Sequence, residues 1–166
     1  MSARRVFSTL ALAMLIAACA KPAEQTAAVP AVDSAAVKAA VADVWVRWSA
    51  ADTAGNVEAV VALVADSARL DFRGMPPLIG RAAFRTMAEA NLKSMDISAL
   101  NIIPEMTTAI SDGLAYETGN YVEAYTMNRK NLTDYGRYAA AVGKDADGQW
   151  RVFYLMAFAD STITKK

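Results

Sequence analysis

Carboxyl and phenol groups are the side chains of this sequence that could carry acid–base chemistry, because the chain contains no histidine. That absence excludes a Ser-His-Asp triad, a Cys-His pair and a histidine-ligated zinc site. Cys19 is the only cysteine, so the rest of the chain holds neither a disulfide nor a catalytic thiolate. We predict no metal site and no cofactor. The candidate catalytic residues are four acids: Asp71, Glu105, Glu117 and Glu123.

Two of these acids belong to one expected strand, residues 114–127. Its alternation places Glu117, Tyr121 and Glu123 on one face, and a bulge near Gly119 would exchange the two faces. We expect both glutamates on the solvated convex face, and no general base with a strongly raised pKa inside the domain. A carboxylate buried beside a tyrosine hydroxyl would instead favour an enzyme, because burial raises the pKa of a carboxyl group until it can exchange protons.

Helical periodicity precedes strand periodicity along the chain, which indicates an α+β fold. Asp33 can cap a first helix and Asn56 a second. Gly80 opens a third helix at a bend, where we expect a backbone conformation that a Cβ atom restricts. Five strands are expected, at residues 68–72, 98–110, 114–127, 134–143 and 149–159.

Six short motifs follow one another in the expected domain. They are Trp48 to Asn56, Ala62 to Ala68, Met75 to Arg85, Ala115 to Tyr121, Asp134 to Tyr138, and Asp147 to Val152. With these motifs, residues 35–160 resemble the nuclear transport factor 2-like superfamily, and within it the SnoaL-like group, which includes many domains of unknown function. The resemblance implies three N-terminal helices packed in the concave side of a curved antiparallel sheet. Such a cone has a pocket in its wide end.

The resemblance also implies that aromatic side chains line the pocket, although ordinary core packing is the alternative for each of them. The candidate ligand-binding residues are Trp48, Phe72, Tyr121, Tyr138 and Phe158. Enzymes of the superfamily, such as ketosteroid isomerase and the SnoaL-like cyclases, place acids and tyrosines in this pocket. Many SnoaL-like sequences have an aspartate about five residues after the tryptophan of the last strand, where this chain has Leu155. This departure counts against catalysis.

The N-terminus resembles the signal of a bacterial lipoprotein. Arg4 and Arg5 precede an apolar run, residues 6–18, that is too short to span a bilayer. The end of this run and Cys19 resemble a lipobox, which implies a lipid anchor on that cysteine. Ala20 follows it, and by analogy this favours the outer membrane, facing the periplasm, of a Gram-negative cell. A plain signal peptide cut nearby is the alternative.

The expected organisation has four parts. They are a signal peptide (1–18), the lipidated cysteine with a flexible tether (19–33), the cone domain (34–160) and a C-terminal tail (161–166). The chain has 17 basic and 17 acidic residues and no basic stripe, which argues against a nucleic-acid partner. The expected partner is therefore the membrane, reached through the lipid anchor, in the cell envelope.

Three functions fit these observations. The first is a domain that binds a small apolar molecule or a protein partner in the envelope. The second is a pocket enzyme of the ketosteroid isomerase or SnoaL-like cyclase type, which would use Asp or Glu together with Tyr. The third is a structural module that forms a homodimer through its sheet face.

Overall fold

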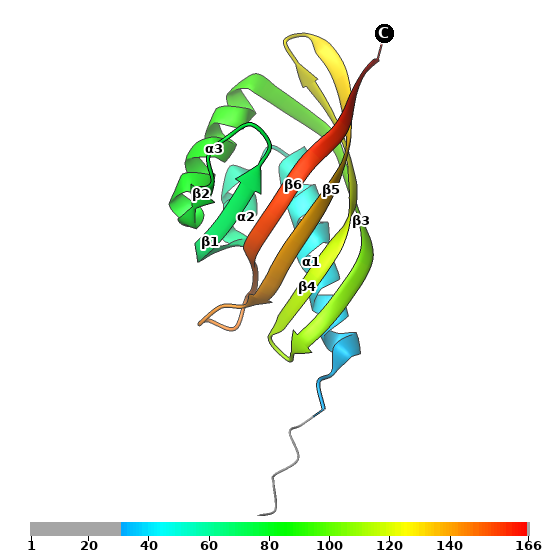
Figure 1. Cartoon of the computed structure of the whole chain (residues 1–166). Coiled ribbons are helices and arrows are strands. Elements are labelled where there is room, and N and C mark those ends of the chain that lie inside the picture. The colour runs from blue at the N-terminus through cyan, green and yellow to red at the C-terminus, as the bar shows by residue number, and fades with distance from the viewer. Residues whose placement is uncertain (1–30, 166) are drawn as a thin grey trace, which may run out of the picture. The chain divides into compact units, whose positions relative to one another are not determined.

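Three helices and six strands make up residues 31–165, the part of the chain that the structure, a computed structural model, describes (Figure 1). The elements are α1 (Ser34–Thr53), α2 (Val57–Ala62), β1 (Val64–Phe72), β2 (Leu78–Ile79), α3 (Gly80–Ser94), β3 (Met95–Ser111), β4 (Leu114–Met127), β5 (Lys130–Lys144) and β6 (Trp150–Lys165). The predicted α+β class is confirmed. The expected signal peptide and Cys19 lie outside the described residues.

The first two helices begin at the predicted caps. The Asp33 carboxylate accepts a hydrogen bond from the Ala36 backbone N–H at 3.0 Å, and the Asn56 side chain accepts one from Ala59 at 3.1 Å. The apolar side chains that recur at helical spacing along α1 form a buried stripe: Val37, Val41, Val44, Trp45 and Trp48. None of the helices in residues 31–165 combines the length and the apolar content needed to cross a membrane.

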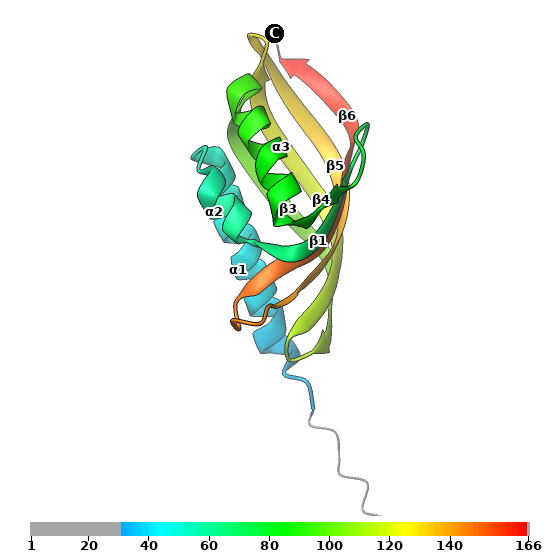
Figure 2. The same cartoon turned by 90° about the vertical axis from the view of Figure 1, so that its left-hand side faces the viewer.

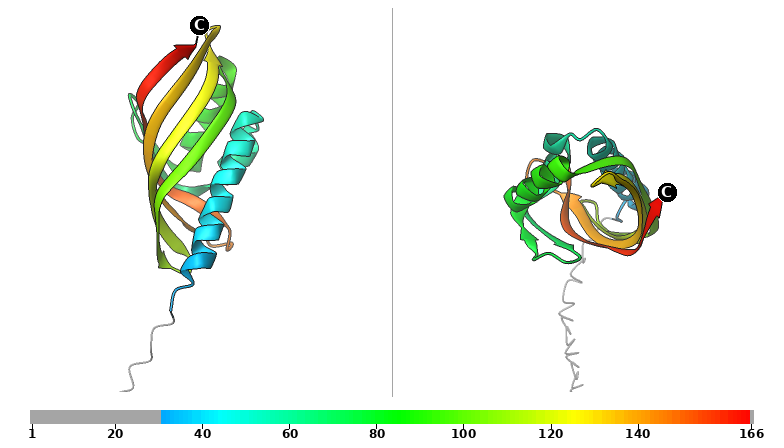
Figure 3. Two further views of the ribbon diagram at one scale, coloured as in Figure 1. Left: turned by 90° about the vertical axis from the view of Figure 1, so that its right-hand side faces the viewer. Right: turned by 90° about the horizontal axis from the view of Figure 1, so that it is seen from above.

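The six strands form one curved sheet in the order β2-β1-β6-β5-β4-β3. The last four strands are the predicted antiparallel meander, while β1 runs parallel to β6. All three helices lie on the same side of this sheet (Figure 2). Seen from above, the strands curl around an interior that the helices close (Figure 3). The core therefore lies between the concave face of the sheet and the helices, as the cone fold requires.

The short strand β2 was not predicted, and β3 begins at Met95 rather than at residue 98. Three further strand boundaries differ from the prediction by four or more residues. β1 begins at Val64 rather than at residue 68, because α2 already ends at Ala62. β5 begins at Lys130 rather than at residue 134, directly after a two-residue turn. β6 continues through Lys165, beyond its expected end at residue 159.

The Gly80 prediction is confirmed. Its φ is +83°, in the left-handed region, and a Cβ atom there would lie 3.0 Å from the carbonyl oxygen of Asp66. Both observations favour glycine at the bend where β2 passes into α3. The Arg81 guanidinium, next in the chain, bonds the Val64 carbonyl oxygen at 2.6 Å and pairs with Asp66 at 2.9 Å. These contacts fix the start of α3 against β1.

Candidate functional site

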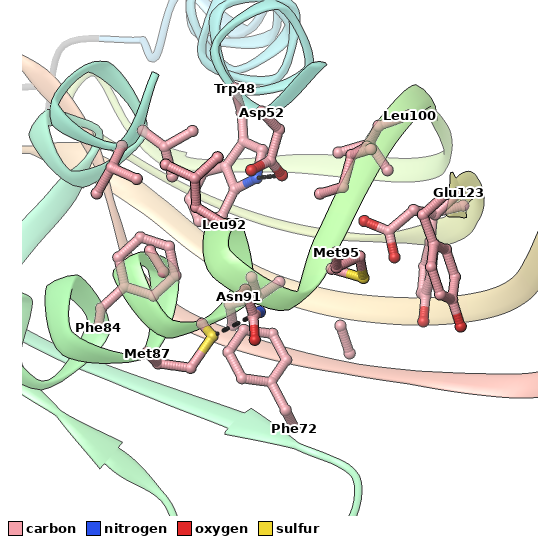
Figure 4. Close-up of a pocket in the computed structure, with 18 of the residues that line it drawn as sticks. Trp48, Asp52, Phe72, Phe84, Met87, Asn91, Leu92, Met95, Leu100 and Glu123 are labelled. Atoms are coloured by element: carbon pink, nitrogen blue, oxygen red, sulfur yellow. Dashed lines mark hydrogen bonds between the residues drawn. The ribbon is translucent and has the colours of Figure 1, made fainter. Parts of the chain in front are cut away.

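A cavity of about 400 Å³ lies between the concave face of the sheet and the three helices. Most of its wall is apolar, with Trp48 and Phe84 in ring contact at a centroid distance of 5.4 Å. The exposed side chains of Met75 and Leu92 are part of its lining, so the cavity reaches the protein surface. Figure 4 shows how the labelled side chains of α1, α3, β1, β3 and β4 converge on this space. Its size and lining are those of a small-molecule site.

Two carboxyl groups of the cavity wall have strongly raised pKa values. Burial raises the pKa of Glu123 to about 7, and the nearby charges of Asp52 and Asp134 add to the effect. Burial also raises the pKa of Asp52 to about 6, although the hydrogen bond from the indole N–H of Trp48, at 3.1 Å, acts in the opposite direction. Figure 4 shows Asp52 beside Trp48 on α1 and the Glu123 carboxylate directed into the cavity from β4. Both groups can therefore exchange protons near neutral pH.

Tyrosines accompany these acids on the sheet side of the cavity. Tyr121, Glu123 and Tyr125 share one face of β4, as the alternation predicted, but this is the concave face. The expectations that Glu123 would face solvent, and that no base with a strongly raised pKa would lie inside the domain, are therefore wrong. β4 pairs with β5 without a register shift along its whole length, so no bulge at Gly119 exchanges its faces. Burial and the neighbouring acids raise the pKa of Tyr121, which keeps its hydroxyl protonated as a hydrogen-bond donor.

Space for the Tyr121 ring comes from a glycine on the next strand. Gly136 lies directly opposite Tyr121 in the β4–β5 register. A Cβ atom on Gly136 would lie 2.4 Å from the Tyr121 ring and 2.5 Å from the carbonyl oxygen of Phe158. No side chain larger than hydrogen fits there without displacing the tyrosine.

Glu117 contradicts the expectation that it would lie on the solvated convex face. Only 2% of the residue is exposed, and its carboxylate accepts three hydrogen bonds. The donors are the Trp45 indole N–H at 2.5 Å, the Tyr138 hydroxyl at 2.7 Å and the Thr107 hydroxyl at 2.6 Å. Burial, followed by the hydrogen bond to Glu117, raises the pKa of Tyr138. Glu117 therefore meets the condition that was predicted to favour an enzyme, a buried carboxylate beside a tyrosine hydroxyl. It lies outside the cavity lining, however, and both of its oxygens are occupied, so it holds Trp45 and Tyr138 in place.

The other predicted site residues divide between the cavity and the outer surface. Trp48, Phe72, Tyr121, Tyr138 and Glu123 line the cavity, and so does Leu155. Asp71 pairs with Arg69 at 2.9 Å, and Glu105 accepts a hydrogen bond from Asn120 at 2.6 Å. Neither of these two acids reaches the cavity.

Phe158 was expected in the pocket, and this expectation is wrong. Its ring lies 5.2 Å from the Arg137 guanidinium, and neither residue is in the cavity lining. Strand alternation explains the error, because Leu155 and Ala157 of β6 face the cavity and Phe158 must point the other way.

Asp52 and Asp134 are cavity acids that the sequence interpretation missed. One signal could have revealed Asp52: it follows Trp48 by four residues, so the two side chains are neighbours on the buried stripe of α1. Asp134 had no comparable signal. Its place opposite Glu123 depends on the register between β4 and β5.

No protein-family model matches the sequence, and no curated protein matches it. Solved structures do match its fold. A ketosteroid isomerase-like protein from Erwinia carotovora atroseptica SCRI1043 has a TM-score of 0.67 at 14% identity, over 74% of this chain and 95% of that one. The hexachlorocyclohexane dehydrochlorinase LinA-type3 from Novosphingobium barchaimii LL02 has a TM-score of 0.69 at 12% identity, over 79% and 91% of the two chains.

A third match carries the name of the fold. It is an NTF2-like protein with a cystatin-like fold from Novosphingobium aromaticivorans, with a TM-score of 0.58 at 13% identity, over 75% of this chain and 82% of that one. At such low identities the likeness concerns the fold alone. The described domain therefore has the cone fold of the nuclear transport factor 2-like proteins, as its sequence motifs predicted.

Proposed function

We propose that the domain binds a small, mainly apolar molecule in the cone cavity. The observation that carries this proposal is the cavity itself, about 400 Å³ within an apolar wall that reaches the surface. Ligand sites of this kind occupy roughly 300–1,000 Å³ and combine apolar walls with a few polar groups that orient the ligand. Here the polar groups are carboxyl and phenol side chains on α1, β4 and β5.

A cavity-filling substitution tests the proposal. Ala157 faces the cavity, whereas Met156 beside it is 38% exposed and points away. We expect Ala157→Trp to fill the site and weaken binding of the neutral fluorescent probe N-phenyl-naphthylamine at least tenfold, about 1.4 kcal/mol. Met156→Trp adds a larger ring on the other face of the same strand and should bind the probe like the wild type. Fluorescence titration measures both variants.

Two results would contradict this assignment. One is the absence of probe binding to the wild type. The other is equal binding by the Ala157→Trp and Met156→Trp variants, because the probe would then occupy some other surface. Cooperative thermal unfolding of both variants shows that each is folded.

The proposed location is the cell envelope, with a lipid anchor on Cys19. The support is the lipobox-like sequence at residues 15–19 with its single cysteine. We expect the wild type to incorporate a palmitate analogue during growth and Cys19→Ser to lose the label, because the thioether needs sulfur. Thr26→Ser, in the expected tether, is the matched control and should keep the label. Equal labelling of the wild type and Cys19→Ser would contradict the anchor.

An enzyme is the second candidate, favoured by the pKa values of Asp52 and Glu123. An ionised Glu123 would take a proton from the carbon next to a substrate carbonyl group. The electrons of that C–H bond would move onto the carbonyl oxygen to form an enolate, and Tyr121 would donate a hydrogen bond to this oxygen. Return of the proton to another carbon would complete an isomerisation. Conversion of a β,γ-unsaturated ketone such as cyclohex-3-enone into its α,β-unsaturated isomer, lost in Glu123→Gln, would distinguish this enzyme from a binding protein.

A further inference from the structure

The cavity wall carries acids without a compensating base. Asp52, Asp96, Glu123 and Asp134 belong to the lining, which includes neither lysine nor arginine. Two arginines near the sheet are engaged elsewhere. Arg137 pairs with Asp160 at 2.8 Å, and Arg73 donates a hydrogen bond to the Ala159 carbonyl oxygen at 3.1 Å. No described basic side chain therefore offsets the charge of the cavity.

Glu123 and Asp134 form a like-charge pair across two strands. The β4–β5 register places them directly opposite one another, and both side chains face the cavity. Like charges in such a cross-strand pair destabilise a sheet, whereas opposite charges or apolar partners stabilise it. Asp134 receives only a long hydrogen bond, 3.4 Å from the Tyr125 hydroxyl to each carboxylate oxygen. Among the side chains that the structure describes, the Glu123 carboxylate has neither a hydrogen-bond donor nor an ion-pair partner.

Aromatic rings stand beside these acids. Trp48 lines the cavity next to Asp52 (Figure 4). Tyr121 and Tyr125 also line it, on either side of Glu123 along β4. A positive group within about 6 Å of such a ring is attracted to its face, and the attraction increases away from water. The wall thus combines acids, aromatic faces and apolar surface. A metal ion has less support, because residues 31–165 contain no group of three or more acidic or thiol ligands arranged to hold one.

We propose that the cavity binds an organic cation, a primary ammonium or quaternary ammonium group on an apolar body. The positive group lies between Glu123 and Asp134 and faces Asp52. The proposal rests on the function proposed above, since it requires the cavity to be a ligand site. The cation offsets the repulsion between the opposed carboxylates, and the apolar body fills the space beside Phe72 and Phe84. A ligand with a carboxylate head is rejected, because it would add a further negative charge to an acidic wall.

Cation binding also predicts proton release. The titratable groups that interact with Glu123 are Asp52 from α1, Tyr121 and Tyr125 from β4, and Asp134 from β5. Asp96 of β3 and Tyr138 of β5 also line the cavity. A bound cation favours the ionised form of each nearby carboxyl group, so it lowers the pKa of Glu123 and Asp52. At neutral pH, part of the Glu123 population is protonated and releases that proton on binding.

Isothermal titration of the full chain with phenylbutylamine, phenylbutanol and phenylbutyrate tests the proposal, because the three probes share one apolar body. We expect the amine to bind roughly tenfold more tightly than the alcohol, and the carboxylate to bind weakest. Each proton that is released on binding is taken up by the buffer, and the heat of this uptake differs between phosphate and Tris. The measured heat of amine binding at about pH 7 should therefore differ between the two buffers in proportion to the number of protons released.

Variants locate the charge. Glu123→Gln and Asp134→Asn should each reduce the preference for the amine over the alcohol severalfold, because only the amine gains from the carboxylate charge, while Glu105→Gln, on the outer surface, should leave the binding of both probes as in the wild type. Alcohol binding as tight as amine binding would overturn the cation proposal and leave the apolar site in place. Binding of N-phenyl-naphthylamine without binding of phenylbutylamine would also overturn the cation proposal and leave the apolar site in place. Failure of all four probes would overturn the proposed function as well.

Discussion

Replacing Glu117 by alanine is expected to lower the free energy of unfolding by about 3–5 kcal/mol. The carboxylate is buried and accepts hydrogen bonds from Trp45, Tyr138 and Thr107, which come from α1, β5 and β3. Alanine would leave these donors without an acceptor in a site that it also leaves partly empty. A loss of this size corresponds to a fall of roughly 15 °C in the midpoint of thermal unfolding.

Two further variants make this expectation specific. Glu117→Gln keeps the shape and one acceptor oxygen, so it should lose no more than about half as much stability. Glu105→Ala removes a glutamate on the outer side of β3 that accepts a hydrogen bond from Asn120. Its free energy of unfolding should stay within about 0.5 kcal/mol of that of the wild type. A buried carboxylate without a cation can also destabilise a fold. If Glu117→Ala were as stable as the wild type, that cost would outweigh the three hydrogen bonds.

The sequence predicted the helices better than the strand ends. The apolar stripe of α1 and the cap at Asp33 are local features, and local features can be identified from sequence. The turn between β4 and β5 was missed because Asn128 and Arg129 have φ values of 52° and 62°, and an arginine rarely occupies such a conformation. The start of β5 was therefore placed four residues too late.

The candidate site shows the same contrast between local features, which the sequence predicts, and features that depend on the tertiary fold, which it does not. Alternation along β4 predicted correctly that Tyr121 and Glu123 share a face, but it could not show which face would be buried. That depended on the curvature of the sheet around α1, which places Trp45 over Glu117. Nor could spacing within one segment reveal that Asp134 would lie opposite Glu123. The cavity itself is a property of the packed helices and sheet.

The predicted homodimer through the sheet face concerns the outer, convex side of the sheet. Exposed apolar side chains on β3, β4 and β5 include Ile103, Met106, Ile110, Tyr116 and Tyr135. They are compatible with the expected homodimer through the sheet face, and that assembly stays a prediction. The cavity does not depend on it, because its lining comes from the concave side of one chain.

The stability of the wild type should fall as the pH rises from about 5 to 8. The pKa of Glu123 is about 7 in the folded protein against an ordinary 4.5, and that of Asp52 is about 6 against 3.8. The folded state therefore binds more protons than the unfolded state in this window, and stability is lost as pH rises through the folded pKa values. The chain has no histidine that could titrate between pH 5 and 8. Asp71 and Asp160 are already ionised at pH 5, because their arginine partners lower their pKa values.

Glu123→Gln isolates the main contribution to this pH dependence. Glutamine stays neutral beside Asp134 and Asp52, so the variant should match the wild type near pH 5 and exceed its stability at pH 8 by ~2 kcal/mol. Thermal unfolding at the two pH values should show a difference of roughly 5 °C or more at the higher pH only. Glu105→Gln should follow the wild type at both. If Glu123→Gln lost as much stability as the wild type between these pH values, Glu123 would already be ionised at pH 5, and the opposed carboxylates would repel each other far less than their burial implies.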